Sequence, residues 1–339
     1  MQAALRGTAP SAHPAARQRL AARGGTARRA LAPPARRAAA AASGGGGGGV
    51  LASPEQQAPA LAALAALHGA LGAATTLAPA WSMQLLGFAP TPAPTGQLQI
   101  AGAYCFLIVS CLLCLKDAAL HGRLGSDTYK RLGLGVMYQC VVFAVLLAKN
   151  RTIFTSATLG VGGAVFLGTA LVAARVYAAG TGGFSLPAVV RGFAAGVADL
   201  ARPKTLLSGF YALCAALALY QFFWQFPAPG TPLFLLDEGA AAVMLKQARG
   251  GGMLLAGVVW ATLKDAADRG RLAASTFRTL NLAMALVAAL QLWGYWSISS
   301  AGVPCVPGLL CALLGTGVLT VVVCDAAFFL HRKRPEAAA

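Results

Sequence analysis

Two stretches of the chain repeat one pattern of charged side chains. The segment that starts at Leu115 reads LKDAALHGRLGSDTYKRL and the segment that starts at Leu263 reads LKDAADRGRLAASTFRTL, with ten identical residues in eighteen positions. Lysine and arginine beside a membrane can bind a phosphate or carboxylate substrate, or the headgroup of an anionic lipid. The candidate site residues, expected at the mouth of a central cavity, are two equivalent sets: Lys116, Asp117 and Arg123, and Lys264, Asp265 and Arg271.

The same pattern also fits a capped turn between two membrane helices. Gly122 and Gly270 suit the left-handed conformation that ends a helix. Asp127 and Ser275 then suit the N-cap of the helix that follows. Ionisable groups at helix ends can reach water along their own alkyl stems, so they need no ligand to be tolerated. Capping and anchoring therefore explain nearly every position, and a binding site remains the alternative.

His68 is a further candidate, because it lies alone in an apolar stretch. It could ligate a tetrapyrrole cofactor or relay a proton, although a single histidine in such a place is often a hydrogen-bonded part of the structure. The eight cysteines all lie within or beside apolar segments, where a thiol behaves as a small hydrophobic group, so we expect no metal site and no disulfide. We predict no bound cofactor.

Enzymatic chemistry finds no support in the sequence, although it is not excluded. The part of the chain after the N-terminal leader contains no acyl-transfer triad, dinucleotide-binding loop or phosphate-binding loop. The composition is 57% hydrophobic and 11% charged, which is too apolar for an ordinary soluble domain. The sequence therefore predicts an all-α, polytopic membrane protein.

Eight apolar segments are about long enough to cross a bilayer as helices. The predicted spans are residues 59–79, 98–117, 132–148, 157–178, 206–226, 248–265, 280–297 and 305–330. A shift of 148 residues superimposes the last four spans on the first four and places Gln99 over Gln247 and Gly102 over Gly250. Because four spans return the chain to its starting side, the two four-helix repeats should be parallel.

The repeats divide the chain into five parts. A first repeat covers residues 58–178 and a second covers 206–331, joined by a linker over 179–205 that we expect to contain a short interfacial helix around 187–200. Residues 332–339 form a C-terminal tail. Residues 1–57 are expected to be a disordered transit peptide and glycine-rich linker, since eight arginines precede the first acidic residue, Glu55.

The distribution of basic residues predicts an orientation. With eight spans, fifteen lysines and arginines fall on the side of the repeated motif and four fall on the other side, namely Lys149, Arg151, Lys246 and Arg249. Loops rich in lysine and arginine remain on the side of the membrane where the protein is made or imported. Here that side is the stroma of a plastid or the matrix of a mitochondrion. The net charge of +17 therefore reflects topology and import rather than nucleic-acid binding.

Two functions are compatible with these features. The first is a non-catalytic scaffold or assembly protein in a chloroplast membrane, either thylakoid or inner envelope, whose partners are the lipid bilayer and other membrane proteins. The second is a transporter of a small solute or lipid that uses the interface between the two repeats. Richness of the leader in Ala, Ser, Gly and Pro favours the plastid, with the mitochondrial inner membrane as the second choice.

Overall fold

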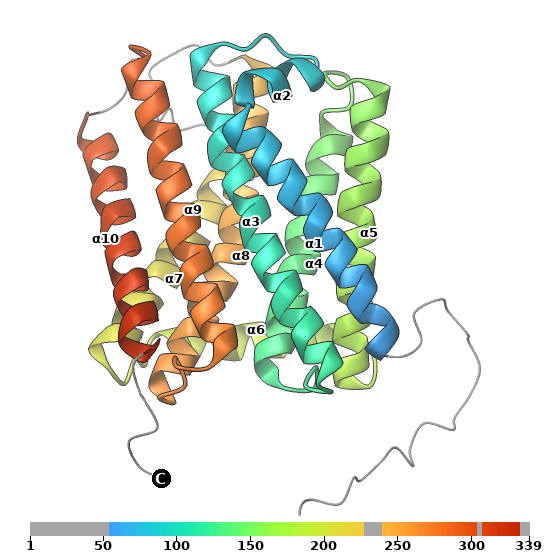
Figure 1. The fold of residues 1–339 in the computed structure, drawn as a ribbon, viewed down its shortest axis with the longest axis vertical. Helices are drawn as coiled ribbons and strands as arrows, with labels where there is room; N and C mark the ends of the chain where they lie inside the picture. The colour runs from blue at the N-terminus through green and yellow to red at the C-terminus, as the bar shows by residue number, and fades with distance from the viewer. Residues whose placement is uncertain (1–53, 227–238, 304–306, 333–339) are drawn as a thin grey trace, which may run out of the picture. The chain divides into compact units, whose positions relative to one another are not determined.

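The structure is a computed structural model that describes residues 54–226, 239–303 and 307–332, all within one compact unit. In these three ranges it contains ten α-helices and no strand (Figure 1). The predicted all-α fold class is therefore confirmed for the described residues. Residues 1–53 of the predicted leader and 333–339 of the predicted tail lie outside the described residues.

Eight helices are long and two are short. The long helices are α1 (Pro54–Leu77), α3 (Pro92–Leu120), α4 (Asp127–Lys149), α5 (Ser156–Thr181), α7 (Leu206–Gln225), α8 (Ala240–Asp268), α9 (Ser275–Ser300) and α10 (Pro307–Arg332). The short helices are α2 (Pro79–Leu85) and α6 (Leu186–Leu200). Helix α6 matches the short helix expected in the linker, whereas α2 was not expected.

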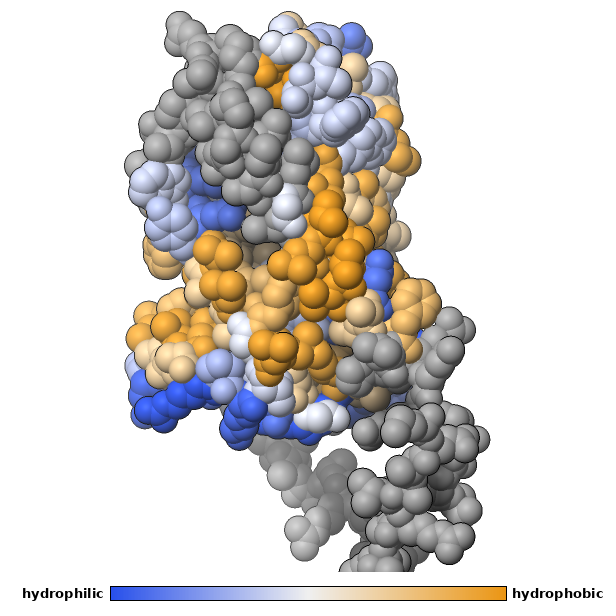
Figure 2. All heavy atoms as spheres, turned by 90° about the vertical axis from the view of Figure 1, so that its left-hand side faces the viewer, coloured by the Kyte–Doolittle hydropathy of each residue, from blue (hydrophilic) through white to orange (hydrophobic). Residues whose placement is uncertain are grey.

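Six of the long helices are long and apolar enough to cross a membrane. They are α1 from Gln56, α3, α4, α5, α7 and α9, and a shorter apolar segment covers Gly317–Ala327. Helix α8 is not among the six, since it carries charged residues on both sides of its apolar segment: Lys246 and Arg249 before it, and Lys264 and Asp265 after it. The chain is thus a helical, multi-pass membrane protein. Figure 2 shows the apolar surface across the middle of one face, with hydrophilic residues below it.

Helices α3 and α8 form the centre of the described bundle. Helix α3 packs against α1, α8 and α9, and α8 packs against α7, α3 and α4. The outer pairs are α4 with α5 and α9 with α10. Each central helix thus contacts a helix from the other half of the chain, so residues 58–178 and 206–331 pack as one body rather than as two separate domains.

The two turns of the repeated motif have the same backbone. Gly122 has φ of 63° and Gly270 has φ of 64°, which confirms the left-handed helix ends predicted from the sequence. The N–H of Arg123 donates to the carbonyl of Ala118, and the N–H of Arg271 donates to that of Ala266, both at 2.8 Å. The two copies of the motif therefore close their helices with the same hydrogen bond.

Several predicted boundaries are wrong. The N-caps are Ser126 and Ala274, so Asp127 and Ser275 are the first helical residues instead of the caps. Helix α1 already begins at Pro54, inside the linker predicted to be disordered through residue 57, because proline is tolerated in the first turn. For the same reason α3 begins at Pro92, within a proline-rich stretch that the predicted spans leave out.

Candidate functional site

The first copy of the charged motif forms an exposed cluster at the end of α3. A nitrogen of Arg123 donates to Asp117, and the Nδ1 atom of His121 lies 3.1 Å from Oδ1 of the same carboxylate. The guanidinium of Arg123 also lies over the ring of Tyr129, 5.8 Å from its centre. These contacts tie the end of α3 to the first turn of α4.

The second copy repeats this arrangement at the end of α8. Arg271 lies 3.7 Å from Asp265 and 5.6 Å from the ring centre of Phe277. These two contacts correspond to those of Arg123 with Asp117 and Tyr129. Asp265 also pairs with Arg269 at 2.8 Å and with Arg131 of α4 at 3.7 Å. The second aspartate is therefore surrounded by three arginines, one of which comes from the first half of the chain.

The two lysines of the motif differ in their surroundings. Lys264 is 1% exposed, and its Nζ lies 2.8 Å from a carboxylate oxygen of both Asp199 and Asp268. Lys116 is half-buried and forms no ion pair in the described part of the chain. The residue of the first repeat that aligns with Asp268 is Leu120, so the first lysine lacks this carboxylate.

The six predicted site residues thus form two helix-end networks. None of the six lines the cavity described below. Their observed partners are charged groups and aromatic rings of the protein itself, which is what the capping interpretation requires. A role of these residues in binding a substrate or lipid headgroup stays a prediction.

His68 is fully buried between α1 and α5. Its Nε2 atom lies 3.0 Å from Oγ1 of Thr169, and its ring packs against Phe166. Because Thr169 donates its own proton to the carbonyl of Val165 at 2.7 Å, His68 must donate to Thr169. The Nδ1 atom is buried and has no hydrogen-bond partner. This geometry fits a neutral histidine that holds two helices together.

Six cysteines are free thiols, and five of these six are buried: Cys105, Cys111, Cys114, Cys140 and Cys324, with Cys214 partly exposed. The described residues contain no group of three or more histidine, cysteine, aspartate or glutamate side chains placed to hold a metal ion.

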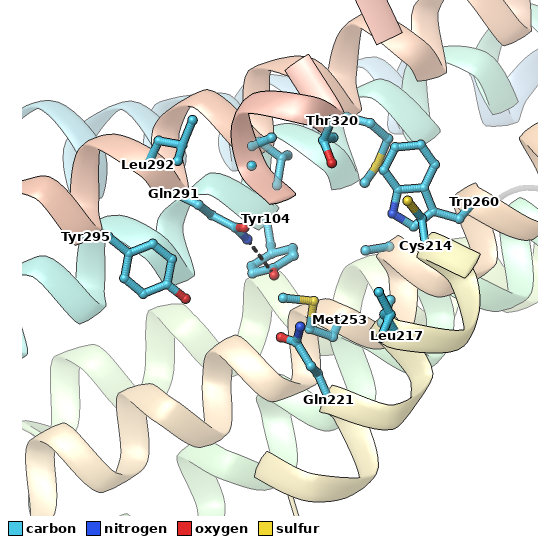
Figure 3. Close-up of a pocket in the computed structure, with 16 residues that line it drawn as sticks. Tyr104, Cys214, Leu217, Gln221, Met253, Trp260, Gln291, Leu292, Tyr295 and Thr320 are labelled. Carbon is cyan, nitrogen blue, oxygen red and sulfur yellow. Dashed lines mark hydrogen bonds between the residues drawn. The ribbon is translucent and has the colours of Figure 1, made fainter. Parts of the chain in front are cut away.

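A cavity of about 280 Å³ lies among α7, α8, α9 and α10, and Tyr104 of α3 also lines it (Figure 3). Its apolar wall consists mainly of aliphatic side chains and methionines: Leu217, Ala218, Met253, Ala256, Met284, Val287, Ala288 and Leu292. Most ligand sites in proteins combine such an apolar wall with a few polar groups.

The polar groups of the cavity come from four helices, with Thr320 supplied by α10. Gln291 of α9 donates to the hydroxyl of Tyr104 at 2.6 Å, and the buried Oε1 atom of Gln221 of α7 has no hydrogen-bond partner. These three side chains extend their polar ends toward one another across the cavity, and Tyr295 of α9 lies beside them (Figure 3). The sequence offered no local signal for this arrangement, since uncharged polar residues occur in many apolar helices.

Arg249 of α8 lies behind this cavity wall. It is 5% exposed and donates to the hydroxyl of Tyr295 at 2.7 Å and to Oε1 of Gln225 at 2.9 Å. The predicted topology counted Arg249 with the loops because the span was expected to begin at residue 248. Helix α8 begins at Ala240 instead, which carries Arg249 into the bundle.

A comparison with models of known protein families finds no match. A comparison with curated protein sequences finds none either. The function is therefore inferred from the geometry alone.

Proposed function

We propose that this multi-pass membrane protein binds a small solute or lipid in the cavity behind Tyr104 and carries it across the membrane. The observation that carries the proposal is the cavity itself, which combines an apolar wall with the polar side chains of Tyr104, Gln221, Gln291, Tyr295 and Thr320. Polar groups inside a membrane protein are costly unless they are paired or used. The oxygen of Gln221 is such a group, since it is buried without a hydrogen-bond partner.

The same proposal includes eight spans arranged as two parallel repeats. Helix pairing supports it, because α1–α3 corresponds to α7–α8 and α4–α5 corresponds to α9–α10. The pair α3–α9 likewise corresponds to α8–α4, as expected for two halves related by an axis along the membrane normal. Helix α8 packs against the candidate spans α3, α4 and α7, so it should cross the bilayer beside them.

Two aligned glutamines give further support for the repeat. Gln99 donates its amide to the carbonyl of Thr76 at 3.1 Å, and Gln247 donates to the carbonyl of Phe226 at 3.2 Å. In both halves the second long helix is thereby fastened to the C-terminal end of the first. The cavity then lies where Tyr104 of the first repeat meets the helices of the second.

We place the protein in a chloroplast membrane, with the mitochondrial inner membrane as the alternative. The support is the arginine-rich leader described above, which lies outside the described residues. Fusion of residues 1–57 to a fluorescent protein tests this point, since import into plastids is expected and import into mitochondria would overturn the assignment.

A scaffold function, favoured by the sequence, gains less from the geometry. The outward faces of α7, α9 and α10 carry exposed apolar side chains, and lipid covers such faces as well as a partner protein does. The cavity, in contrast, favours a protein that binds a ligand. Transport therefore becomes the first hypothesis and assembly the second.

Reconstitution into liposomes tests transport directly. Uptake of a panel of small radiolabelled solutes and lipids should exceed that of empty liposomes for at least one class. Ala288→Phe should abolish that uptake, because Ala288 is buried in the cavity wall and the ring would fill the space. Leu286→Phe is the matched control, since Leu286 lies two residues away on the same helix and is exposed. Equal loss of uptake in both variants, or no uptake of any compound, would contradict the proposal.

A further inference from the structure

We propose that the ligand of this cavity carries a carboxylate, held by the hydroxyl groups of Tyr295 and Tyr104 and stabilised by the charge of Arg249. This inference rests on the proposed function, whose ligand it assigns to a chemical class: small carboxylates with an apolar body.

The first argument is the uncompensated charge of Arg249. A guanidinium stays protonated, and in a membrane bundle it is normally paired with a carboxylate or used for function. Its two hydrogen-bond acceptors, the Tyr295 hydroxyl and the Gln225 amide, are both neutral. No carboxylate of the described residues lies within ion-pair distance of Arg249. A ligand anion would supply the missing charge.

The second argument is the orientation of the phenols. The hydroxyl of Tyr295 accepts a hydrogen bond from Arg249, and the hydroxyl of Tyr104 accepts one from Gln291. Each hydroxyl therefore keeps its own proton for a further acceptor. Both tyrosines line the cavity, so two O–H donors are available to one ligand. Oxygen atoms of a carboxylate are strong acceptors for such donors.

The third argument is the position of the charge. Arg249 is 5% exposed, and it donates a hydrogen bond to Gln225, the last residue of α7. It also contacts the ring face of Tyr295, with 5.7 Å between the guanidinium carbon and the ring centre. A buried charge is screened less by water, so its electrostatic attraction to an anion is stronger than at an exposed surface.

The fourth argument concerns the rest of the ligand. Aliphatic side chains and methionines make up most of the wall, so the part of the ligand beyond the carboxylate should be apolar. The volume of about 280 Å³ is at the small end of ligand sites, which span roughly 300–1,000 Å³. A medium-chain carboxylate such as octanoate fits both requirements.

Binding to the purified full-length chain in lipid nanodiscs tests the inference. Calorimetry should give octanoate an affinity about tenfold to a hundredfold higher than octanamide or octanol, as expected for hydrogen bonds to a charged acceptor. Arg249→Gln and Tyr295→Phe should each reduce this preference to less than about threefold and leave octanol binding in place. Arg151→Gln is the matched control, because Arg151 is an exposed arginine in the loop after α4 and should keep the full preference.

The outcomes separate this inference from the proposed function. Equal affinity of the wild-type chain for octanoate, octanamide and octanol would overturn the carboxylate assignment and leave a ligand cavity in place. If Ala288→Phe did not weaken the binding of any of the three, the cavity itself would not be the site and both proposals would fail. Should Arg249→Gln prevent folding, Tyr295→Phe decides alone, since the tyrosine ring and its packing remain.

Discussion

The ring of Tyr104 lies directly against Gly252, the residue with which a shift of 148 positions aligns it. Two aligned positions thus face each other where α3 packs against α8, as the proposed pair of parallel repeats requires. One partner is large and the other has no side chain, so the two helices can approach closely. A Cβ atom at Gly252 would overlap the ring of Tyr104.

We therefore predict that Gly252→Ala destabilises the bundle by about 1–3 kcal/mol, the usual cost of overpacking a core. Thermal unfolding in detergent measures the effect as a lower midpoint. The double variant Gly252→Ala with Tyr104→Leu should recover part of the loss. Gly163→Ala on α5 is the control, because a Cβ there meets no atom within 4 Å, and it should be neutral or slightly stabilising. Equal effects at both glycines would show that the Tyr104 contact is unimportant.

The second prediction concerns the turn glycines. Gly122→Ala and Gly270→Ala should each cost about 1–2 kcal/mol, because an L-residue is strained in the left-handed region and no neighbouring atom adds to the cost. Asparagine, which tolerates this conformation, should cost less at both sites. Unfolding midpoints of the four variants test whether the two turns respond alike. A large loss at one turn and none at the other would argue against their equivalence.

The third prediction contrasts the two lysines of the motif. Lys264→Met removes the ammonium group that pairs with Asp268. Asp268 keeps its hydrogen bonds from Ser208 and the backbone N–H of Lys204, so the variant should lower stability by about 1–3 kcal/mol. Lys116→Met should change stability by less than about 0.5 kcal/mol, because Lys116 is half-buried and has no ion pair in the described residues. Comparable losses at the two positions would refute this distinction.

A pH dependence follows from the same network. Burial alone would raise the pKa of Asp268, but hydrogen bonds from Lys264, Ser208 and the backbone N–H of Lys204 outweigh it and bring the pKa below its usual value. The ionised carboxylate thus stabilises the fold above the ordinary aspartate pKa, and this contribution is lost as the pH falls through the lowered value. Stability of the wild type should fall more steeply than that of Asp268→Asn between about pH 4 and pH 2. Parallel curves would contradict the lowered pKa.

Much of the fold is predictable from the sequence, because membrane helices have a strong local signal. Uninterrupted apolar residues predict the long helices, and the polar motif predicts the left-handed turns at Gly122 and Gly270. Helix ends are less predictable. The charges of Lys246 and Arg249 interrupt the apolar pattern, so the sequence places the start of the sixth span at residue 248 and misses the first two turns of α8.

The cavity is not predictable in the same way. Its polar residues, Tyr104, Gln221 and Gln291, are far apart in the chain and come together only through helix packing. That packing includes the contact of Tyr104 with Gly252, and the alignment of these two positions does not by itself predict that they touch. The charged motif attracts notice because it is repeated, whereas Arg249 has no counterpart, since the shift of 148 residues aligns it with Ala101.

The last prediction uses the direction of the hydrogen bond between His68 and Thr169. Thr169→Val should leave the N–H of a fully buried histidine without an acceptor and cost about 1–3 kcal/mol. His68→Leu should cost less than Thr169→Val, because the hydroxyl of Thr169 still donates to the carbonyl of Val165. The double variant should be more stable than Thr169→Val alone, since no unpaired donor remains. Unfolding midpoints of the three variants decide the matter, and if His68→Leu proved the most damaging, the histidine would have a role beyond this hydrogen bond.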